Sequence, residues 1–466
     1  MIRFFKTYLL LTIVVFIFYS CGSTKKIVAP VALNTLPPLR ESVVNIPFKI
    51  YAKPFLMAAE NKTPLQFTSV GWPDFMPSGC DFRYKYRFVR SGFRFSCVNN
   101  KALLTMIGHY QLAGSKTVCA FGKQVSPWVT GSCGFSPEPL RRVEINISSQ
   151  FNFQPDYTMR SRSGVEKITA IDKCFVTILN SDITNLVTDS IRSSVDVFAS
   201  SLDQTIAGLN YSPVISKVGA AVGKKIPLSS YGFIKINPSA IHISPFNYSR
   251  DTLSFVAGFS CFPEISSDSN NRVITSFLPP LSSATLNPGF AINVNAAYDY
   301  RFIDTLLTSF IKNRAFELEG RTIYVQNLAV KGLENNRVEL RFDFSGSKNG
   351  TVYLTGTPVL DTVNQVISIP DLDYSIRSRD FLLTLGKTFL NQKIIRTIRE
   401  KAVIKIGDLY LSNKARMDSA FNRNISPKIL TTGATRQISL TAMVVKKDDF
   451  LFQLRALGTM NVAVGR

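Results

Sequence analysis

The chain has 466 residues, of which 45% are apolar and 18% are charged. This composition is typical of a folded protein and excludes a fully disordered one. Lysine and arginine outnumber the acidic residues by 54 to 32, which gives a formal net charge of +22. An excess of that size indicates an anionic partner or surface. Because the chain has only 2 histidines, multi-histidine metal sites are excluded and imidazole-based catalysis is not expected.

The first 20 residues are typical of a secretory signal peptide. A basic start is followed by a twelve-residue apolar run, Tyr8–Tyr19. Spanning a bilayer as a helix takes about 20 apolar residues, so this run is too short. The sequence then reads Ser20-Cys21, and a small residue directly before a cysteine resembles a bacterial lipoprotein signal. The resemblance implies that residues 1–20 are removed and that Cys21 is lipidated, as in palmitate-bearing lipoproteins. An uncleaved membrane anchor is the alternative.

The segment after the signal predicts where the protein resides. Residues 21–42 are polar and contain several prolines, so we expect a lipidated N-terminus followed by a tether. No aspartate stands beside Cys21 to retain the lipoprotein in the inner membrane, and no acidic export run follows. We therefore expect a lipid-anchored protein at the periplasmic face of the outer membrane.

Six further cysteines suggest disulfides, since their number is even and the protein is expected to be exported. They are Cys80, Cys97, Cys119, Cys133, Cys174 and Cys261. The sequence does not determine their pairing. Short loops slightly favour Cys80–Cys97 and Cys119–Cys133, which leaves Cys174–Cys261. No C-x-x-C pair supports a metal site instead.

Strand patterns dominate the first half of the chain. Residues alternate with period two in several segments, and we expect strands at 43–51, 82–90, 102–112, 141–153, 165–179, 231–236 and 252–262. One long helix interrupts them, about 182–209. Its apolar residues recur in steps of three and four, which predicts a single apolar stripe along the helix.

The second half repeats this order of elements. Residues 289–313 read as a strand running into a helix, as residues 45–61 do in the first half. Further strands are expected at 321–332, 336–346, 351–359 and 365–376, a second long helix at about 379–406, and a final hairpin of 438–445 with 450–464. The repeated order of elements suggests an internal duplication. We expect one domain at 43–270, which contains the disulfides, and a second at 271–466.

Several stretches together resemble the lipoprotein family of domain of unknown function 4403. They are NIPFKI (45–50), CDFRYKYRFVRSGFRF (80–95), the pair Cys119 and Cys133, INPSAIHI (236–243), AYDYRFIDTLL (297–307) and, as the best match, residues 351–383. That family in turn resembles the tubular lipid-binding (TULIP) superfamily. The resemblance implies an α+β fold of two tandem TULIP-like units, each a highly curved antiparallel β-sheet wrapped around a long amphipathic helix. The resemblance assigns no catalytic residue to this chain.

The two helical stripes supply candidate residues for an apolar tunnel. The candidates are Ile191, Val195, Phe198 and Leu202 in the first helix and Phe389, Ile394 and Ile398 in the second. Binding of a lipid there would be driven by apolar burial. The alternative is a plain packed core, which the sequence does not distinguish from a tunnel.

One strand-rich segment supplies candidates for contact with an anionic surface. The residues are Arg83, Lys85, Arg87, Arg90 and Arg94, most of them on one face of the expected strand 82–90. For an envelope protein the available anions are lipid headgroups or an acidic cell-wall polymer rather than nucleic acid. The alternative is an ordinary solvated sheet face.

These observations predict a non-enzymatic lipoprotein that binds or transfers lipids or other hydrophobic ligands in the cell envelope. Motifs of hydrolases, zinc proteases and phosphate-binding loops are absent from the sequence, and no cofactor or metal is expected. The main alternative is a structural or adaptor lipoprotein without a ligand. A carbohydrate-active enzyme would require a carboxylate pair in a cleft.

Overall fold

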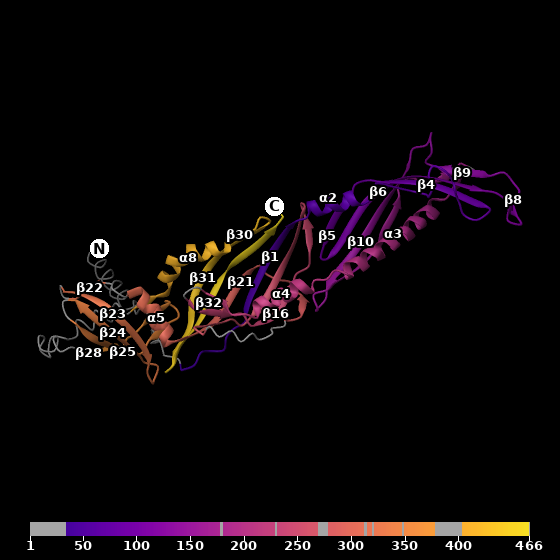
Figure 1. Ribbon diagram of the computed structural model, residues 1–466. Coiled ribbons are helices and arrows are strands. Elements are labelled where there is room, and N and C mark those ends of the chain that lie inside the picture. The colour runs from indigo at the N-terminus through magenta and orange to yellow at the C-terminus, as the bar shows by residue number, and fades with distance from the viewer. Residues whose placement is uncertain are drawn as a thin grey trace, which may run out of the picture.

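The computed structural model describes residues 34–177, 180–228, 231–268, 278–311, 315–318, 321–346, 349–377 and 403–465. The fold is mixed α+β and consists mostly of antiparallel sheet, so the predicted α+β class is confirmed. Figure 1 shows an elongated molecule in which the strands follow one another along the long axis. The predicted signal peptide and the first part of the tether lie outside the described residues.

The first half of the chain forms the sheet at one end of the molecule. Its strands β4, β6, β10 and β11 are antiparallel neighbours in that order, and β5 and β9 also pair with β6. The long strands are β4 (Phe82–Arg90), β5 (Arg94–Val98), β6 (Lys101–Lys116), β9 (Val129–Cys133), β10 (Arg141–Phe153) and β11 (Met159–Ala170). The short ones are β2 (Gln66–Thr68), β3 (Met76–Pro77), β7 (Cys119–Ala120), β8 (Lys123–Gln124), β12 (Phe175–Val176) and β13 (Ser181–Asp182).

The long helix predicted at 182–209 is present as α3 (Thr184–Ala207). At 1.5 Å per residue it extends for about 36 Å, and it lies beside the sheet of the first half (Figure 1). Helix α4 (Ser212–Val222) follows it. The strand predicted at 165–179 is wrong in position, because β11 ends at Ala170 and the chain then leaves the sheet to reach α3.

Strand β1 (Ser42–Tyr51) lies at the centre of the molecule and connects the two halves. It pairs antiparallel with β18 (Thr252–Cys261) along its whole length and with β21 (Gly289–Asp299) at its start. Strand β21 pairs with β32 (Asp449–Val464), whose end also runs parallel to β1. In each half, a long strand near its start therefore pairs with a long strand near its end, and the two strands near the starts, β1 and β21, also pair with each other. The remaining central strands are β14 (Ile226–Pro227), β15 (Phe233–Lys235), β16 (Pro238–Ile243), β17 (Asn247–Ser249), β19 (Glu264–Ser266) and β20 (Leu281–Ser283).

The repeated strand-and-helix unit is present in both halves. Helix α2 (Lys53–Lys62) follows β1, and helix α5 (Tyr300–Ile311) follows β21. The same 20-stranded sheet contains strands from both sides of the domain boundary expected near residue 270.

The second half continues from this sheet with a separate five-stranded sheet. The latter contains β22 (Ala315–Leu318), β23 (Arg321–Gly332), β24 (Val338–Gly346), β25 (Gly350–Gly356) and β28 (Asp373–Arg377). A smaller sheet joins β26 (Val359–Asp361), β27 (Val366–Ser368) and β29 (Ile404–Lys405). The chain ends with α8 (Ile406–Phe421), β30 (Arg423–Ser426), β31 (Ile429–Val445) and β32. Most of the second predicted helix, at 379–406, lies outside the described residues, and with it Phe389, Ile394 and Ile398.

Candidate functional site

Helix α3 is attached to the outer edge of strand β11 by two of its aspartates. The carboxylate of Asp203 accepts hydrogen bonds from the Ser163 N–H (2.8 Å) and from the hydroxyls of Ser161 (2.6 Å) and Ser163 (2.7 Å). The carboxylate of Asp196 accepts one from the Val165 N–H (2.9 Å). These bonds satisfy backbone donors that would otherwise face outwards from the edge of a sheet.

The strand register shows which face of the sheet the helix covers. Ser161 is opposite Phe151, and Ser163 is opposite Ser149, whose hydroxyl lies 2.8 Å from the Ser163 hydroxyl. Cross-strand partners point to the same face of a sheet. Because the two serine side chains reach Asp203, Phe151 lies on the face that carries α3, and so does Phe153 two residues further along β10.

The first half of the α3 stripe is packed against this face. Val187 is 8% exposed and belongs to a buried cluster with Val143 and Ile145 of β10. Ile191 and Val195 pack against the same cluster. These two residues, predicted to line a tunnel, therefore lie against the hydrophobic core.

In the second half of α3 the buried position is Ala199, which is 0% exposed, whereas the larger apolar residues of the stripe are open. Phe198 lies eleven residues after Val187 and Leu202 four residues later, spacings that keep them on one helix face. Phe198 is nevertheless 49% exposed and Leu202 is 38% exposed. Leu209, just beyond the helix, is also exposed. Two of the predicted ligand-binding residues thus present apolar surface that the described protein leaves uncovered.

An aromatic cluster continues from β10 towards the centre of the sheet. The ring centroid of Phe246 lies 5.7 Å from that of Phe151 and 5.6 Å from that of Phe153. Phe246 also stacks on Phe255 at 4.3 Å, and Phe255 stacks on Phe48 of β1 at 5.1 Å. We call the surface of Phe151, Phe153, Phe198 and Leu202 the open α3 face. It borders a continuous row of rings that extends to the centre of the molecule.

Electrostatics stabilise the attachment of α3 rather than creating a reactive group. Burial tends to raise the pKa of Asp203, but the hydrogen bonds from Ser161 and Ser163 outweigh it and keep this pKa below its usual value. The carboxylate is therefore ionised at neutral pH, the state in which it accepts all three bonds. Asp196 and Asp203 were not predicted from the sequence. Their spacing of seven residues, which places both on one helix face, is the signal that could have revealed them.

The cationic residues predicted to contact an anionic surface are mostly engaged within the protein. The Arg83 guanidinium lies between the rings of Phe75 (4.7 Å) and Trp128 (4.3 Å). Lys85 Nζ lies 4.6 Å from the centre of the Phe75 ring and donates to the Pro73 carbonyl at 3.0 Å. Such cation–π contacts stabilise the loop over the strand.

The prediction is wrong for Arg90, whose side chain is only 1% exposed. It forms an ion pair with Glu60 and donates to four backbone carbonyls, those of Glu60, Thr63, Pro64 and Ser91. Arg87 donates to Gln66 at 3.1 Å, while Arg94 remains exposed. Arg90 therefore fastens the segment after α2 to β4 and is inaccessible to an external anion.

The predicted disulfide pairing is also wrong, although four of the six cysteines do form disulfides. The pairs are Cys80–Cys119 and Cys133–Cys174. Cys80 precedes β4 and Cys119 follows β6, and the antiparallel register of these strands places both at one end of the pair. Cys97, the expected partner of Cys80, lies towards the opposite end of β6 because β5 pairs with its start.

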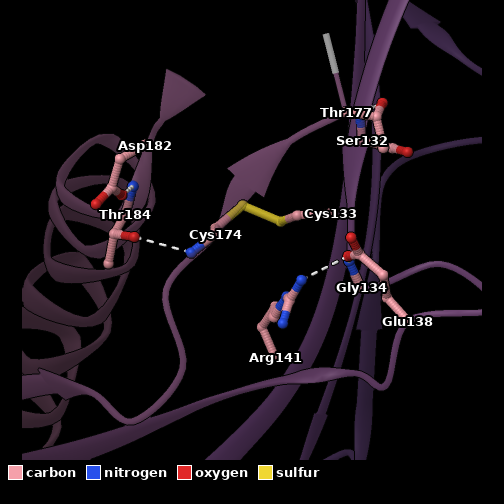
Figure 2. Close-up of a disulfide and its surroundings, with 9 residues drawn as sticks. All are labelled: Ser132, Cys133, Gly134, Glu138, Arg141, Cys174, Thr177, Asp182 and Thr184. Carbon is pink, nitrogen blue, oxygen red and sulfur yellow. Dashed lines mark hydrogen bonds and ion pairs between the residues drawn. A yellow bond between two sulfur atoms is a disulfide. The ribbon is translucent and has the colours of Figure 1, made fainter. Parts of the chain in front are cut away.

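Cys133–Cys174 joins the sheet to the segment that leads into α3. Figure 2 shows Cys174 beside Thr184, whose hydroxyl accepts the Cys174 N–H at 2.8 Å. Both cysteines are fully buried. The last predicted pair, Cys174–Cys261, is likewise wrong, because Cys97 and Cys261 are free and buried. Cys97 is opposite Tyr248 of β17, and Tyr248 is opposite Leu253 of β18. Leu253 lies eight residues before Cys261, a span of about 26 Å along a strand.

Within the described residues, none of the helices is both long and apolar enough to span a membrane. A model of the family of domain of unknown function DUF4403 matches residues 40–464. The chain therefore belongs to this family, as the sequence resemblance predicted. A comparison with curated proteins finds no match.

Proposed function

We propose that this member of the DUF4403 family is a lipid-anchored envelope protein that binds a lipid through an acyl chain on the open α3 face. The anchor is the lipidated Cys21, and the site is the periplasmic face of the outer membrane. In this proposal the protein binds or transfers its ligand without chemical catalysis. Its two halves are tandem TULIP-like units, each with a sheet that wraps a long helix.

The observation that carries the proposal is the contrast along one helical stripe. Val187 is buried, whereas Phe198 and Leu202 on the same helix face are half-exposed. A continuous apolar stripe is usually covered along its whole length when its only task is to form a core. An apolar ligand over the second half of α3 would complete this cover.

The energy available from such cover is sufficient for binding. Burying one methylene group contributes about 0.8 kcal/mol. An acyl chain that loses ten methylenes to the face would therefore gain roughly 8 kcal/mol before the cost of association. The row of rings from Phe151 to Phe48 extends the apolar surface beyond the helix.

The polar groups at this site favour an acyl chain over a peptide. A peptide commonly adds to a sheet by pairing with the free backbone groups of an edge strand. On β11 the N–H groups of Ser163 and Val165 already donate to Asp203 and Asp196. What remains open is apolar side-chain surface, which suits a ligand without backbone hydrogen-bonding groups.

The pairing of the central strands supports the proposal of two tandem units. In each half a long strand near the start leads into a helix and pairs with a long strand near the end of the same half, β1 with β18 and β21 with β32. In both halves a carboxylate of the helix that follows this strand also accepts a backbone N–H from a later segment, Glu60 of α2 from Phe93 and Asp304 of α5 from Val330 of β23. Recurrence of one plan is expected of a duplicated unit.

The test compares charged substitutions inside and outside the open α3 face. Phe198→Asp and Leu202→Asp place a carboxylate where the acyl chain would lie. Leu186→Asp is the matched control, because Leu186 is 67% exposed on another face of the same helix. The assay titrates a fluorescent C18 fatty acid into the full chain, and native mass spectrometry of mildly extracted protein detects lipid that co-purifies.

We expect wild type and Leu186→Asp to bind the probe equally and to retain lipid. Phe198→Asp and Leu202→Asp should each weaken binding at least about tenfold, which corresponds to 1.4 kcal/mol. Equal affinity in all four proteins, together with lipid-free wild type, would refute the proposal and favour the adaptor role.

A further inference from the structure

The hairpin of β7 and β8 forms one end of the molecule. Figure 1 shows β8 at the extreme of the long axis, beyond β4 and β9. At the turn of this hairpin Phe121 is fully exposed and has a left-handed backbone with φ of 50°. A bulky residue seldom adopts that conformation. The turn therefore displays a phenyl ring at an energetic cost in the free protein.

Further exposed apolar side chains lie in the same hairpin and at the start of the neighbouring strand β9. Val118, Val125 and Val129 are each more than half-exposed. We call Val118, Phe121, Val125 and Val129 the apolar tip. An exposed apolar cluster of this kind usually marks a surface that something else covers.

The apolar tip is held rigidly, so it does not collapse onto the protein. The disulfide Cys80–Cys119 fixes the base of the hairpin to the start of β4. The Thr117 hydroxyl donates to the Ser126 carbonyl at 2.6 Å, and the Val118 N–H donates to the Ser126 hydroxyl at 2.9 Å. A braced loop of this kind keeps its apolar residues presented to the solvent.

The charges within the segment that carries the apolar tip have one sign, and the nearest acidic residue is Asp81 of the neighbouring segment, whose carbonyl accepts the Thr117 N–H at 2.9 Å. Residues 116–130 contain Lys116 and Lys123 and no aspartate or glutamate, and both lysines are exposed. Cations next to exposed aromatic and aliphatic residues are the pattern of a segment that enters the boundary between anionic headgroups and acyl chains. A neutral or cationic protein surface would not attract these two lysines.

We propose that the apolar tip inserts into the surface of an anionic membrane, with Phe121 among the acyl chains and Lys116 and Lys123 at the headgroups. This inference does not depend on ligand binding at the open α3 face. Four apolar side chains of this size would gain a few-fold to several hundred-fold in membrane partitioning, depending on depth, and the two lysines would add a salt-dependent component.

The described chain starts far from the apolar tip. Asn34, the first described residue, accepts a hydrogen bond from the Asn336 side chain in the turn between β23 and β24. This turn belongs to the second half, away from the end of the molecule that carries β8 (Figure 1). The start of the described chain and the apolar tip therefore lie towards opposite ends of the molecule.

The test places an indole at the apolar tip of the full chain. Phe121→Trp is compared with Phe55→Trp, because Phe55 is an exposed ring on α2, remote from the tip. Wild type, with Trp72 and Trp128 as its 2 tryptophans, gives the background emission. Each protein is mixed with phosphatidylethanolamine–phosphatidylglycerol vesicles whose acyl chains are either brominated or unmodified.

We expect brominated lipid to quench the added emission of Phe121→Trp at least twofold and to leave that of Phe55→Trp unchanged. Lys116→Glu with Lys123→Glu should abolish the quenching at low salt in these anionic vesicles. When Phe198→Asp is added to Phe121→Trp, the quenching should remain the same. This result separates the test of membrane insertion from that of ligand binding. Unquenched emission from Phe121→Trp, whether or not the protein sediments with the vesicles, would overturn the proposal, and a partner protein would then be the occupant of the apolar tip.

Discussion

Asp203 of helix α3 and Ser163 of strand β11 are joined by two hydrogen bonds. The Ser163 N–H donates to one carboxylate oxygen at 2.8 Å, and the Ser163 hydroxyl donates to the other at 2.7 Å. The carboxylate thus occupies the position that the carbonyl of a neighbouring strand would have in a continuing sheet. It ends the sheet at β11 and fixes the helix on the face where the apolar stripe is needed.

Removing this carboxylate should loosen α3 without unfolding the protein. Asp203→Ala deletes three hydrogen bonds to a charged acceptor, so we expect the free energy of unfolding to fall by about 1–3 kcal/mol. Asp189→Ala is the matched control, because Asp189 is an exposed residue of the same helix and should cost less than about 0.5 kcal/mol. Urea unfolding measures both. Equal stability of the two variants would contradict the role given to Asp203.

The Asp203 carboxylate should make the stability of the protein depend on pH. The pKa of Asp203 is lowered in the folded protein, because hydrogen bonds from Ser161 and Ser163 outweigh burial. A lowered carboxyl pKa stabilises the fold above the unfolded-state pKa, near 3.9, and this contribution is lost as pH falls through the folded-state pKa. The stability difference between wild type and Asp203→Ala should therefore be constant from pH 7 to about pH 5 and should shrink below about pH 4. A difference that grows on acidification would exclude this linkage.

The two ends of the α3 stripe should respond differently to a charge. Val187→Asp buries a carboxylate in the cluster with Val143 and Ile145, so we expect a loss of about 3 kcal/mol or more. Phe198→Asp leaves its carboxylate in water and should cost about 1 kcal/mol or less. Thermal unfolding of the ligand-free protein measures both variants. Comparable losses would mean that the stripe is packed along its whole length.

The disulfides and the free cysteines can be mapped chemically. We expect peptides joined through Cys80–Cys119 and Cys133–Cys174 after digestion without reductant. Cys97 and Cys261 should resist alkylation at neutral pH until the protein unfolds, because both are buried and burial raises the pKa of the Cys261 thiol to about 11. A peptide joined through Cys174–Cys261 would restore the pairing expected from the sequence.

Much of the local structure is readable from the sequence because it depends on periodicity. The alternation in 141–153 predicts β10 residue for residue, and the steps of three and four in 182–209 predict α3 to within two residues at each end. The strand-and-helix units at 45–61 and 289–313 are likewise present. Side-chain period alone determines these elements once one face is buried.

The candidate site was harder to predict from the sequence, because it depends on which distant segments come together in the fold. Periodicity placed Val187 and Phe198 in one stripe but did not show that the core covers only the first of them. Loop length suggested Cys80–Cys97, whereas the antiparallel register of β4 and β6 selects Cys119. Alternation assigned Arg90 to an exposed cationic face, yet the chain after α2 folds over it. Long-range pairing decides each of these outcomes.

Loss of the Arg90 side chain should strongly destabilise the fold. Its buried guanidinium pairs with Glu60 and donates to the backbone carbonyls of Thr63 and Pro64, so it holds the segment after α2 against β4. Arg90→Met leaves Glu60 and these carbonyls without their donor, and we expect the free energy of unfolding to fall by about 3–5 kcal/mol. Arg94→Met, at an exposed position on the next strand, should change it by less than about 0.5 kcal/mol. Unfolding in guanidinium chloride, monitored by circular dichroism, measures the stability of both variants. A small loss for Arg90→Met would show that water reaches this cluster, and the segment after α2 would then be free to act as part of the external surface.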